Sequence, residues 1–273
     1  MKRNQLIAVL LLSGMILFFH SCSVNNVKQD DSLKKFFDEQ KTEGCFAMFD
    51  NSRGEFTIYN LRRDTLRYTP ASTFKIVNAL IAIQTGRILD EKTIIPWDGV
   101  TRERKEWNQD LTLEQAFRYS SVPHFREIAR RIGKDTMKIW IDSLKYGNMN
   151  MGNTVDSFWL DNSIKISPDE QLGLVKKLYF RQLPFRDSVQ AKLKKMMIQE
   201  NNTQYQLAYK TGWGFTENGN ALGWIVGWIE ENRHVYPFVL NIESADHNAD
   251  IPAIRKIIME NILKKLGFFE GKM

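Results

Sequence analysis

The sequence predicts an α/β fold of the α+β type, in which an antiparallel sheet is built from both ends of the chain. Two apolar runs at 45–60 predict its first strands, and three β-like runs near the C-terminus predict the rest: Tyr205–Trp213, Leu222–Glu230 and Val235–Ile242. Between them, residues 110–200 show helical spacing with Pro, Gly and Asn breaks and no sustained strand. We therefore expect flanking helices and an inserted, all-helical lobe.

The first strands are expected to form a hairpin. The runs CFAMFD (45–50) and EFTIYN (55–60) are joined by Asn51-Ser52-Arg53-Gly54, and a short Gly-containing connection between apolar runs is typical of a hairpin. An amphipathic helix, Pro252–Leu266, is expected to close the fold.

A long helix is predicted from Ser72 to about Gly86, over the sequence STFKIVNALIAIQTG. Its apolar residues repeat at helical spacing, and Gly86 is a plausible C-terminal cap. Because the stretch is apolar nearly all round, we expect this helix in the centre of the molecule.

The chain is expected to have three parts. These are a signal peptide at 1–21, a polar tether at 22–34 and one folded domain at 35–273. Within the domain, residues 35–70 and 200–273 should form the sheet lobe, and residues 71–199 the mainly helical lobe.

The N-terminal segment predicts export. Lys2 and Arg3 precede the apolar run Leu6–Phe19, which is shorter than the roughly 20 residues that cross a bilayer. Ser21 and Cys22 follow, as in a bacterial lipoprotein signal where the cysteine thiol is lipidated. An ordinary cleaved signal and a retained anchor are the alternatives. We expect an exported bacterial protein, in the periplasm or tethered to the membrane through Cys22.

Charge and cysteine content exclude other classes. The net charge is +6, and the basic residues alternate with acidic ones, as in TRERKE (101–106). This pattern is typical of a solvated surface and not of a nucleic-acid-binding face. The two cysteines cannot form a four-ligand zinc site, and His124, His234 and His247 are scattered. We expect no metal, and the aspartates flanking His247 are read as a solvated loop.

Four short motifs carry the candidate chemistry. They are Ser72-Thr73-Phe74-Lys75, Ser120-Ser121-Val122, Tyr146-Gly147-Asn148 and Lys210-Thr211-Gly212. A serine at a helix start lies near free N–H groups, and a lysine three residues later shares its face. A desolvated lysine amine can serve as the base that a serine nucleophile needs. Taken alone, Ser72 is as easily a helix cap, and Tyr146-Gly147-Asn148 a simple turn.

In this order, the four motifs resemble those of the penicillin-recognising serine enzymes, and within them the class D (oxacillinase-type) serine β-lactamases. The resemblance extends over most of the chain, through PASTFKI (70–76), WDG (97–99), WNQDLTLEQAF (107–117), YSSVPHFREIARRIG (119–133), FWL (158–160), KTGW (210–213) and GWIVGW (223–228).

The resemblance implies hydrolysis of β-lactam antibiotics through an acyl-enzyme on Ser72. It implies that carbon dioxide or bicarbonate carboxylates Lys75 to N6-carboxylysine, the general base, and that no other cofactor is needed. Trp159 would steady this carbamate, and Ser120 would pass a proton to the departing ring nitrogen. Phe74 and its apolar neighbours Val122, Trp159 and Leu160 would keep the amine dry.

The resemblance also implies a set of substrate-binding residues: Trp107, Val122, Lys210, Thr211, Gly212, Trp213 and Arg255. Lys210 and Arg255 would hold the substrate carboxylate, and Thr211 would donate a hydrogen bond to it. The backbone N–H groups of Ser72 and Trp213 would form the oxyanion hole.

The alternative function is a β-lactam sensor or penicillin-binding domain that acylates without efficient turnover. Sensors of this fold carry several transmembrane helices and a metalloprotease segment. This chain offers one short apolar segment and no H-E-x-x-H, which favours the hydrolase. The expected partner is a small β-lactam, with no nucleic acid, and the protein is expected to be a monomer or homodimer.

Overall fold

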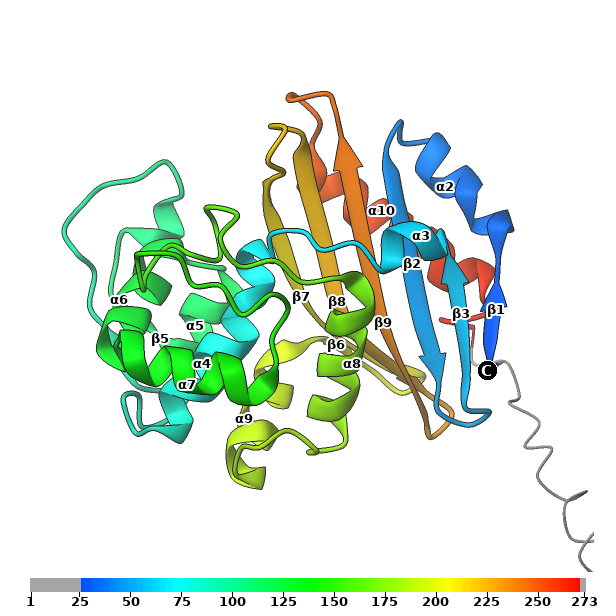
Figure 1. Ribbon diagram of the computed structural model, residues 1–273. Helices are drawn as coiled ribbons and strands as arrows, with labels where there is room; N and C mark the ends of the chain where they lie inside the picture. The colour runs from blue at the N-terminus through cyan, green and yellow to red at the C-terminus, as the bar shows by residue number, and fades with distance from the viewer. Residues whose placement is uncertain (1–25, 271–273) are drawn as a thin grey trace, which may run out of the picture.

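The structure is a computed structural model that describes residues 26–270. A seven-stranded sheet in the order β1-β3-β2-β9-β8-β7-β6 runs through the molecule (Figure 1). Neighbouring strands are antiparallel except for β1 and β3. The strands are β1 (Val27–Gln29), β2 (Glu43–Asp50), β3 (Glu55–Tyr59), β6 (Ile198–Asn201), β7 (Tyr205–Phe215), β8 (Ala221–Glu231) and β9 (His234–Ser244).

The pairing of β2 with β9 joins the N-terminal hairpin to the C-terminal meander, with Gly44 opposite Ile242. The sheet is therefore built from both ends of the chain, which confirms the predicted fold class.

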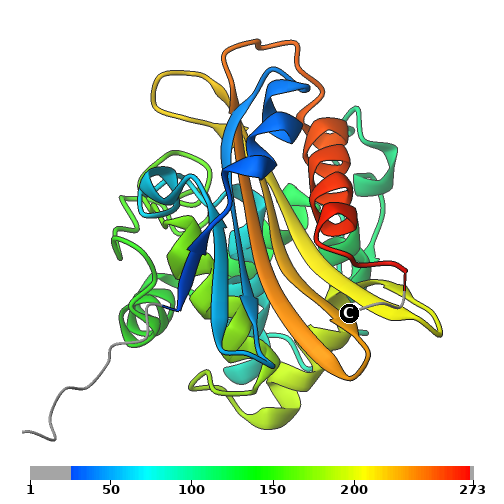
Figure 2. The same cartoon turned by 90° about the vertical axis from the view of Figure 1, so that its right-hand side faces the viewer.

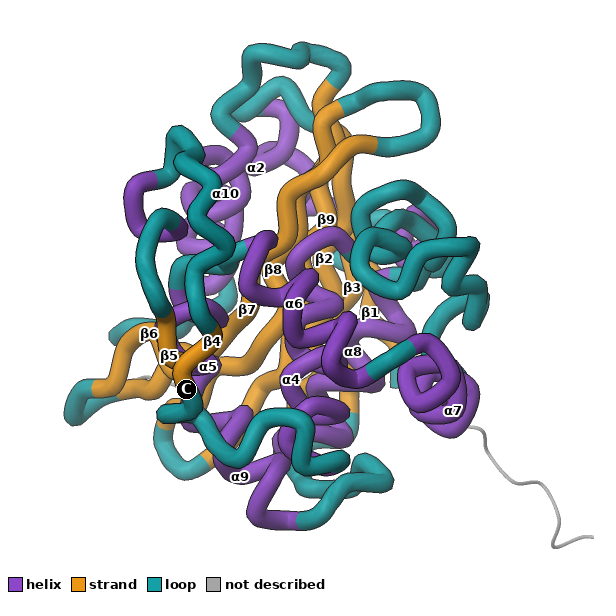
Figure 3. The backbone as a smooth tube through the Cα atoms, turned by 90° about the vertical axis from the view of Figure 1, so that its left-hand side faces the viewer, coloured by secondary structure: helices purple, strands orange, loops and turns teal. Residues whose placement is uncertain are grey.

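Helices cover both faces of the sheet. α2 and α10 pack on one face, and Figure 2 shows α10 lying along the sheet. On the other face lies the helical lobe, where α4 packs between α6 and α9 (Figure 3). The helices are α2 (Lys34–Asp38), α3 (Leu61–Asp64), α4 (Lys75–Gln84), α5 (Leu113–Arg118), α6 (Val122–Ile132), α7 (Lys134–Leu144), α8 (Pro168–Tyr179), α9 (Asp187–Met197) and α10 (Ile251–Lys265).

Short elements complete the fold. A two-stranded ribbon, β4 (Ile94–Ile95) with β5 (Leu111–Thr112), supports the helical lobe. Three 3-10 turns occur within residues 26–270: η2 (Asp31–Leu33), η3 (Ala71–Phe74) and η4 (Lys105–Trp107).

Strand β8 is apolar along its length because both of its faces are buried. Ile225 and Ile229 pack in the cluster beneath α10, whereas Trp224, Val226 and Trp228 belong to the core shared with the helical lobe. A strand buried on both faces carries an apolar run instead of an alternating pattern. The two tryptophans are therefore core residues.

The central helix is shorter than predicted. Every residue of α4 from Lys75 to Ile83 is buried, which confirms its central place. However, residues 71–74 form the 3-10 turn η3, because Ala71 has a φ of 48° and the Thr73 amide bonds to the Pro70 carbonyl at 3.1 Å. Ser72 therefore lies in a tight turn that leads into the α-helix. Gly86 has a φ of 70°, as a C-terminal cap requires.

The predicted polar tether extends too far into the fold. Val27–Gln29 forms the edge strand β1, which pairs in parallel with β3, and Leu33 is fully buried. All three side chains of β1 are exposed, so backbone hydrogen bonds hold the strand and no apolar pattern marks it in the sequence. The signal peptide prediction and Cys22 lie outside the described residues.

The other predicted boundaries differ by a few residues. The three C-terminal strands are longer than expected, and the last helix spans Ile251–Lys265 instead of Pro252–Leu266. Within residues 26–270, no helix has the length and apolar character to cross a membrane. Cys45 is a buried free thiol whose pKa is raised by its burial.

Candidate active site

Ser72 and Lys75 form the centre of the site. The Lys75 amine donates to the Ser72 hydroxyl at 2.7 Å, from the first residue of α4 to the turn before it. Strand β7 can approach this turn because Gly212 has no side chain: a Cβ there would lie 3.0 Å from the Pro70 carbonyl and 3.1 Å from Thr73 Cγ2. The close approach brings Thr211 beside Ser72.

Lys75 lies in an apolar environment. Its side chain is fully buried, and its amine lies 5.5 Å from the centre of the Phe125 ring. Phe74 and Trp159 are also fully buried, with their rings stacked at 5.4 Å. Burial, and then the positive charge of Arg104, lowers the pKa of Lys75 to about 7. The amine is therefore largely neutral just above neutral pH, as a base must be.

The predicted apolar pocket is confirmed in part. Phe74 and Trp159 are buried as expected, while Val122 and Leu160 are partly exposed. Phe125 was not predicted, although it follows the Ser120–Val122 motif closely. The indole Nε1 of Trp159 is buried and has no hydrogen-bond partner among residues 26–270. An unpaired buried donor costs free energy, so this N–H is available to an acceptor in the pocket.

The second pair is Ser120 and Lys210. The Lys210 amine donates to the Ser120 hydroxyl at 2.9 Å and to the Thr211 carbonyl at 3.0 Å. Ser120 has a φ of 53°, a left-handed conformation that is rare for serine. Burial, with the positive charges of Lys75 and Arg255, holds the pKa of Lys210 well below its usual range. The structure thus joins the second and fourth motifs in one hydrogen bond.

These residues surround a pocket of about 230 Å³. Arg255 reaches it from α10, where it is almost fully buried and its guanidinium donates to the Gly212 carbonyl. Burial lowers the pKa of Arg255 to about 10. The pocket is lined by Ser72, Arg104, Trp107, Ser120, Val122, Thr211, Trp213 and Arg255.

Arg104 is the lining residue that the sequence reading missed. It belongs to the charged run 101–106, which was read as solvated surface. Its guanidinium lies 5.1 Å from the centre of the Trp107 ring. The proximity of Arg104 to Trp107 in the sequence was the one available signal, because Trp107 was expected to bind the substrate.

The Tyr146-Gly147-Asn148 motif supports the site from behind. Gly147 has a φ of 54°, and a Cβ there would lie 1.9 Å from the Lys165 carbonyl. Asn148 donates to the Ser163 carbonyl at 2.9 Å and accepts from the Lys165 amide at 3.0 Å. The motif therefore fastens the segment that follows Trp159. Tyr146 packs edge-on against Phe74.

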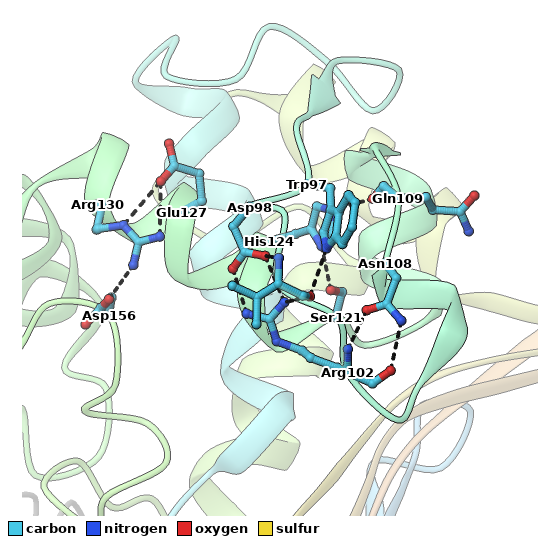
Figure 4. A network of polar contacts seen from close by, with 11 residues as sticks. Trp97, Asp98, Arg102, Asn108, Gln109, Ser121, His124, Glu127, Arg130 and Asp156 are labelled. Atoms are coloured by element: carbon cyan, nitrogen blue, oxygen red, sulfur yellow. Dashed lines mark hydrogen bonds and ion pairs between the residues drawn. The ribbon is translucent and has the colours of Figure 1, made fainter.

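A polar network that includes Ser121, His124 and Gln109 is shown in Figure 4. The His124 ring lies 2.6 Å from the Ser121 hydroxyl and 3.1 Å from the Gln109 carbonyl. The Trp107 indole donates to the Tyr119 carbonyl at 3.1 Å. Two connections thus tie the segment 107–109 to the turn that presents Ser120.

Four of the predicted site residues do not line the pocket. Lys75 and Lys210 are buried and donate to the lining residues Ser72 and Ser120, Gly212 accepts from Arg255, and Trp159 packs on Phe74. Among residues 26–270, no cluster of three or more His, Cys, Asp or Glu side chains is arranged to hold a metal ion.

This fold and this pair of serine–lysine contacts define a serine enzyme of the penicillin-recognising class. The sequence matches the penicillin binding protein transpeptidase domain over residues 37–264. The chain belongs to that family, and within it is homologous to the class D β-lactamases.

Known relatives place the chain more closely. It is 40% identical to a probable β-lactamase, YbxI, of Bacillus subtilis, with 90% of this chain and 86% of YbxI covered. It is 36% identical to β-lactamase OXA-48 of Klebsiella pneumoniae, with 87% and 89% covered. The regulatory protein BlaR1 of Bacillus licheniformis is 33% identical, with 89% of this chain but 40% of BlaR1 covered.

Solved structures show the same two kinds of relative. A class D β-lactamase from Nostoc aligns with a TM-score of 0.82 at 35% identity, covering 87% of this chain and 99% of that one. The C-terminal domain of the Bacillus licheniformis BlaR penicillin receptor aligns with a TM-score of 0.83 at 32% identity, covering 89% and 97%. The fold is therefore shared by hydrolases and a receptor.

Proposed function

We propose that the protein hydrolyses β-lactam antibiotics through an acyl-enzyme on Ser72. One observation carries the proposal: a fully buried Lys75 amine with a pKa of about 7 lies 2.7 Å from the Ser72 hydroxyl. This arrangement places the nucleophile beside an amine that can be neutral near the working pH, which is required both of a lysine base and of an amine that is to combine with carbon dioxide.

Lys75 is proposed to act as its carbamate. The neutral amine attacks carbon dioxide, an N–C bond forms, and the displaced proton leaves to solvent. Two features of the pocket fit this modification: burial keeps the amine neutral, and the unpaired Nε1 of Trp159 is a donor suited to a carbamate oxygen.

Acylation then needs two proton transfers. Ser72 gives its proton to the modified Lys75 as its oxygen bonds to the β-lactam carbonyl carbon. The backbone N–H groups of Ser72 and Trp213 receive the developing oxyanion, which is worth about 3–4 kcal/mol per donor in other acyl-transfer enzymes. When the ring C–N bond breaks, Ser120 passes a proton to the nitrogen, and its hydrogen bond from Lys210 allows that proton to be replaced.

Deacylation uses the same base, once the proton that the modified Lys75 took from Ser72 has moved on through solvent to replace the one that Lys210 gave up. A water molecule gives its proton to the modified Lys75 and attacks the ester carbonyl, and the Ser72 oxygen leaves with a proton returned to it. Lys210, Arg255 and Thr211 are proposed to bind the substrate carboxylate, since Thr211 and Arg255 line the pocket and Lys210 lies beneath it. Trp107 and Val122 would contact the rest of the substrate.

The second candidate is a receptor that acylates and stops, which the likeness to BlaR1 favours. Nitrocefin separates the two functions. A hydrolase opens many molecules of nitrocefin per enzyme, whereas a receptor gives one burst equal to the enzyme concentration. A single-equivalent burst, with a stable adduct in the intact mass, would overturn the hydrolase proposal.

Location and assembly are proposed on the sequence. We infer export to the periplasm, as a lipoprotein tethered through Cys22 or as a processed soluble enzyme. We also propose that the protein is a monomer or a homodimer.

A further inference from the structure

Arg104 stands at the pocket without a partner of opposite charge. It lines the pocket beside Trp107, immediately before the turn η4, and its guanidinium lies 5.1 Å from the centre of the Trp107 ring. Throughout residues 26–270, no carboxylate forms an ion pair with it. By contrast, Arg102, two residues earlier, is paired with Asp98 at 2.6 Å. Arg104 is thus a positive charge that no carboxylate of the described part of the chain neutralises.

The other cations of the site already have hydrogen bonds. Lys210 donates to Ser120 and to the Thr211 carbonyl, and Arg255 donates to the Gly212 carbonyl. No acidic residue lines the pocket. The positive charge of Arg104 also contributes to lowering the pKa of Lys75, Lys210 and Arg255, which places it within electrostatic reach of all three.

We propose that Arg104 binds a second anionic group, carried on the acylamino side chain of the β-lactam, so that the enzyme favours dianionic substrates. This inference rests on the proposed function. The ring carboxylate that every penicillin carries is assigned to Lys210 and Arg255, so a further carboxylate or sulfonate is needed to use Arg104. Its planar guanidinium over an indole ring is a form in which arginine binds such anions.

Two penicillins that differ by one carboxylate test the proposal. Benzylpenicillin carries the ring carboxylate alone, and its α-carboxy analogue carries a second one on the side chain. The measured quantity is the ratio of kcat/KM for the dianion to kcat/KM for the monoanion. Since both substrates use the same Ser72 and Lys75, any effect of Arg104 on that pair cancels in the ratio.

Arg104→Met should lower this ratio about fivefold at low salt, the size expected of one partly exposed ion pair. Arg104→Lys should keep part of the preference, and added salt should shrink the difference between wild type and Arg104→Met. Lys105→Met is the matched control, because Lys105 is the neighbouring exposed cation and does not line the pocket.

The outcomes distinguish the binding of a substrate anion at Arg104 from an effect of the net charge of the protein. An unchanged ratio in Arg104→Met overturns the proposal, and so does an equal fall in Lys105→Met, since the net charge would then explain it. Failure of the proposed function is distinguishable, because wild type would then turn over neither penicillin.

Discussion

The hydroxyl of Ser121 lies 2.6 Å from Nδ1 of His124, and both side chains are buried. The other ring nitrogen, Nε2, faces the Gln109 carbonyl, which can only accept a hydrogen bond. Nε2 therefore carries the proton, and Nδ1 accepts from the serine. The neutral ring links the segment after Trp107 to the residue that follows Ser120.

Loss of this link should reduce both stability and turnover. His124→Leu leaves the buried Ser121 hydroxyl unpaired, which costs about 1–3 kcal/mol, and also removes the partner of the Gln109 carbonyl. We expect a lower denaturation midpoint and a lower kcat, because the Ser120 turn loses a support. In the His124→Leu background, Ser121→Ala should lower the free energy of unfolding by less than it does in wild type, because it removes the hydroxyl that His124→Leu left unpaired. Additive effects would contradict a direct interaction.

The same ring should make stability depend on pH. Burial lowers the pKa of His124, with Asp98 opposing and Arg102 adding to the shift. Its pKa is lower in the folded state, so the unfolded chain binds the proton more readily. Stability should therefore fall as pH drops below about 6.5, the unfolded value. Urea unfolding of wild type and His124→Leu at several pH values across that range measures this dependence. The difference in unfolding free energy between the two proteins should shrink at acid pH.

Ser72→Ala should abolish turnover without unfolding the protein. The substitution removes the nucleophile and one hydrogen bond, which contributes about 0.5–1.5 kcal/mol. Intact-mass analysis should show a penicillin adduct on wild type and none on the variant. Ser52→Ala, in the turn between β2 and β3, is the matched control. An adduct that persists on Ser72→Ala would assign the nucleophile elsewhere.

Activity should depend on bicarbonate at low pH. Lys75 has a pKa of about 7, so its amine becomes protonated as the pH falls below that value and can no longer combine with carbon dioxide. Degassed enzyme should lose rate first at acid pH and recover with added bicarbonate. Rates that do not change with added bicarbonate across this pH range would indicate an unmodified lysine base.

Trp159→Phe tests the donor in the same pocket. The variant keeps a ring against Phe74 but lacks the unpaired indole N–H. If that N–H stabilises the carbamate, the variant should need more bicarbonate for half-maximal activity while its folding stays close to wild type. An unchanged bicarbonate requirement would remove Trp159 from this role.

Cys22→Ser tests the tether. In cells that express wild type, we expect the enzyme in the membrane fraction, because more than one acyl chain makes attachment stable. The variant should appear in the soluble fraction or remain unprocessed. Cys45→Ala is the control, since Cys45 is buried in the fold. A wild-type protein that is soluble, with its N-terminus after Cys22, would contradict the lipid tether, and only the export proposal would remain.

Features with a repeating pattern or a motif were predictable from the sequence. The strand β8 and the Ser72–Lys75 pair were found at the expected residues, and the apolar helix that contains Lys75 was found with a start three residues later than predicted. Hydrophobic periodicity reports burial, and these elements are buried.

Features that depend on backbone pairing, or on where a single polar or charged side chain lies, were not predictable from the sequence. The side chains of β1 are exposed, so only its pairing with β3 reveals it. Arg104 has the same sequence character as its solvated neighbours, and only the fold shows that it faces the pocket. The link between Ser121 and His124 is a buried polar pair whose chemistry matches no motif.

Because the edge strand β1 begins soon after Cys22, a lipid on Cys22 would attach the fold through a short tether. Val27 lies five residues after Cys22, and an extended chain reaches at most about 3.6 Å per residue, or about 18 Å. Strand β7, which presents Thr211 and Trp213, lies five places from β1 in the sheet, about 24 Å away at the usual spacing. A lipidated enzyme would therefore sit close to the bilayer, with strand β1 nearer to the point of attachment than the strand that carries Thr211 and Trp213.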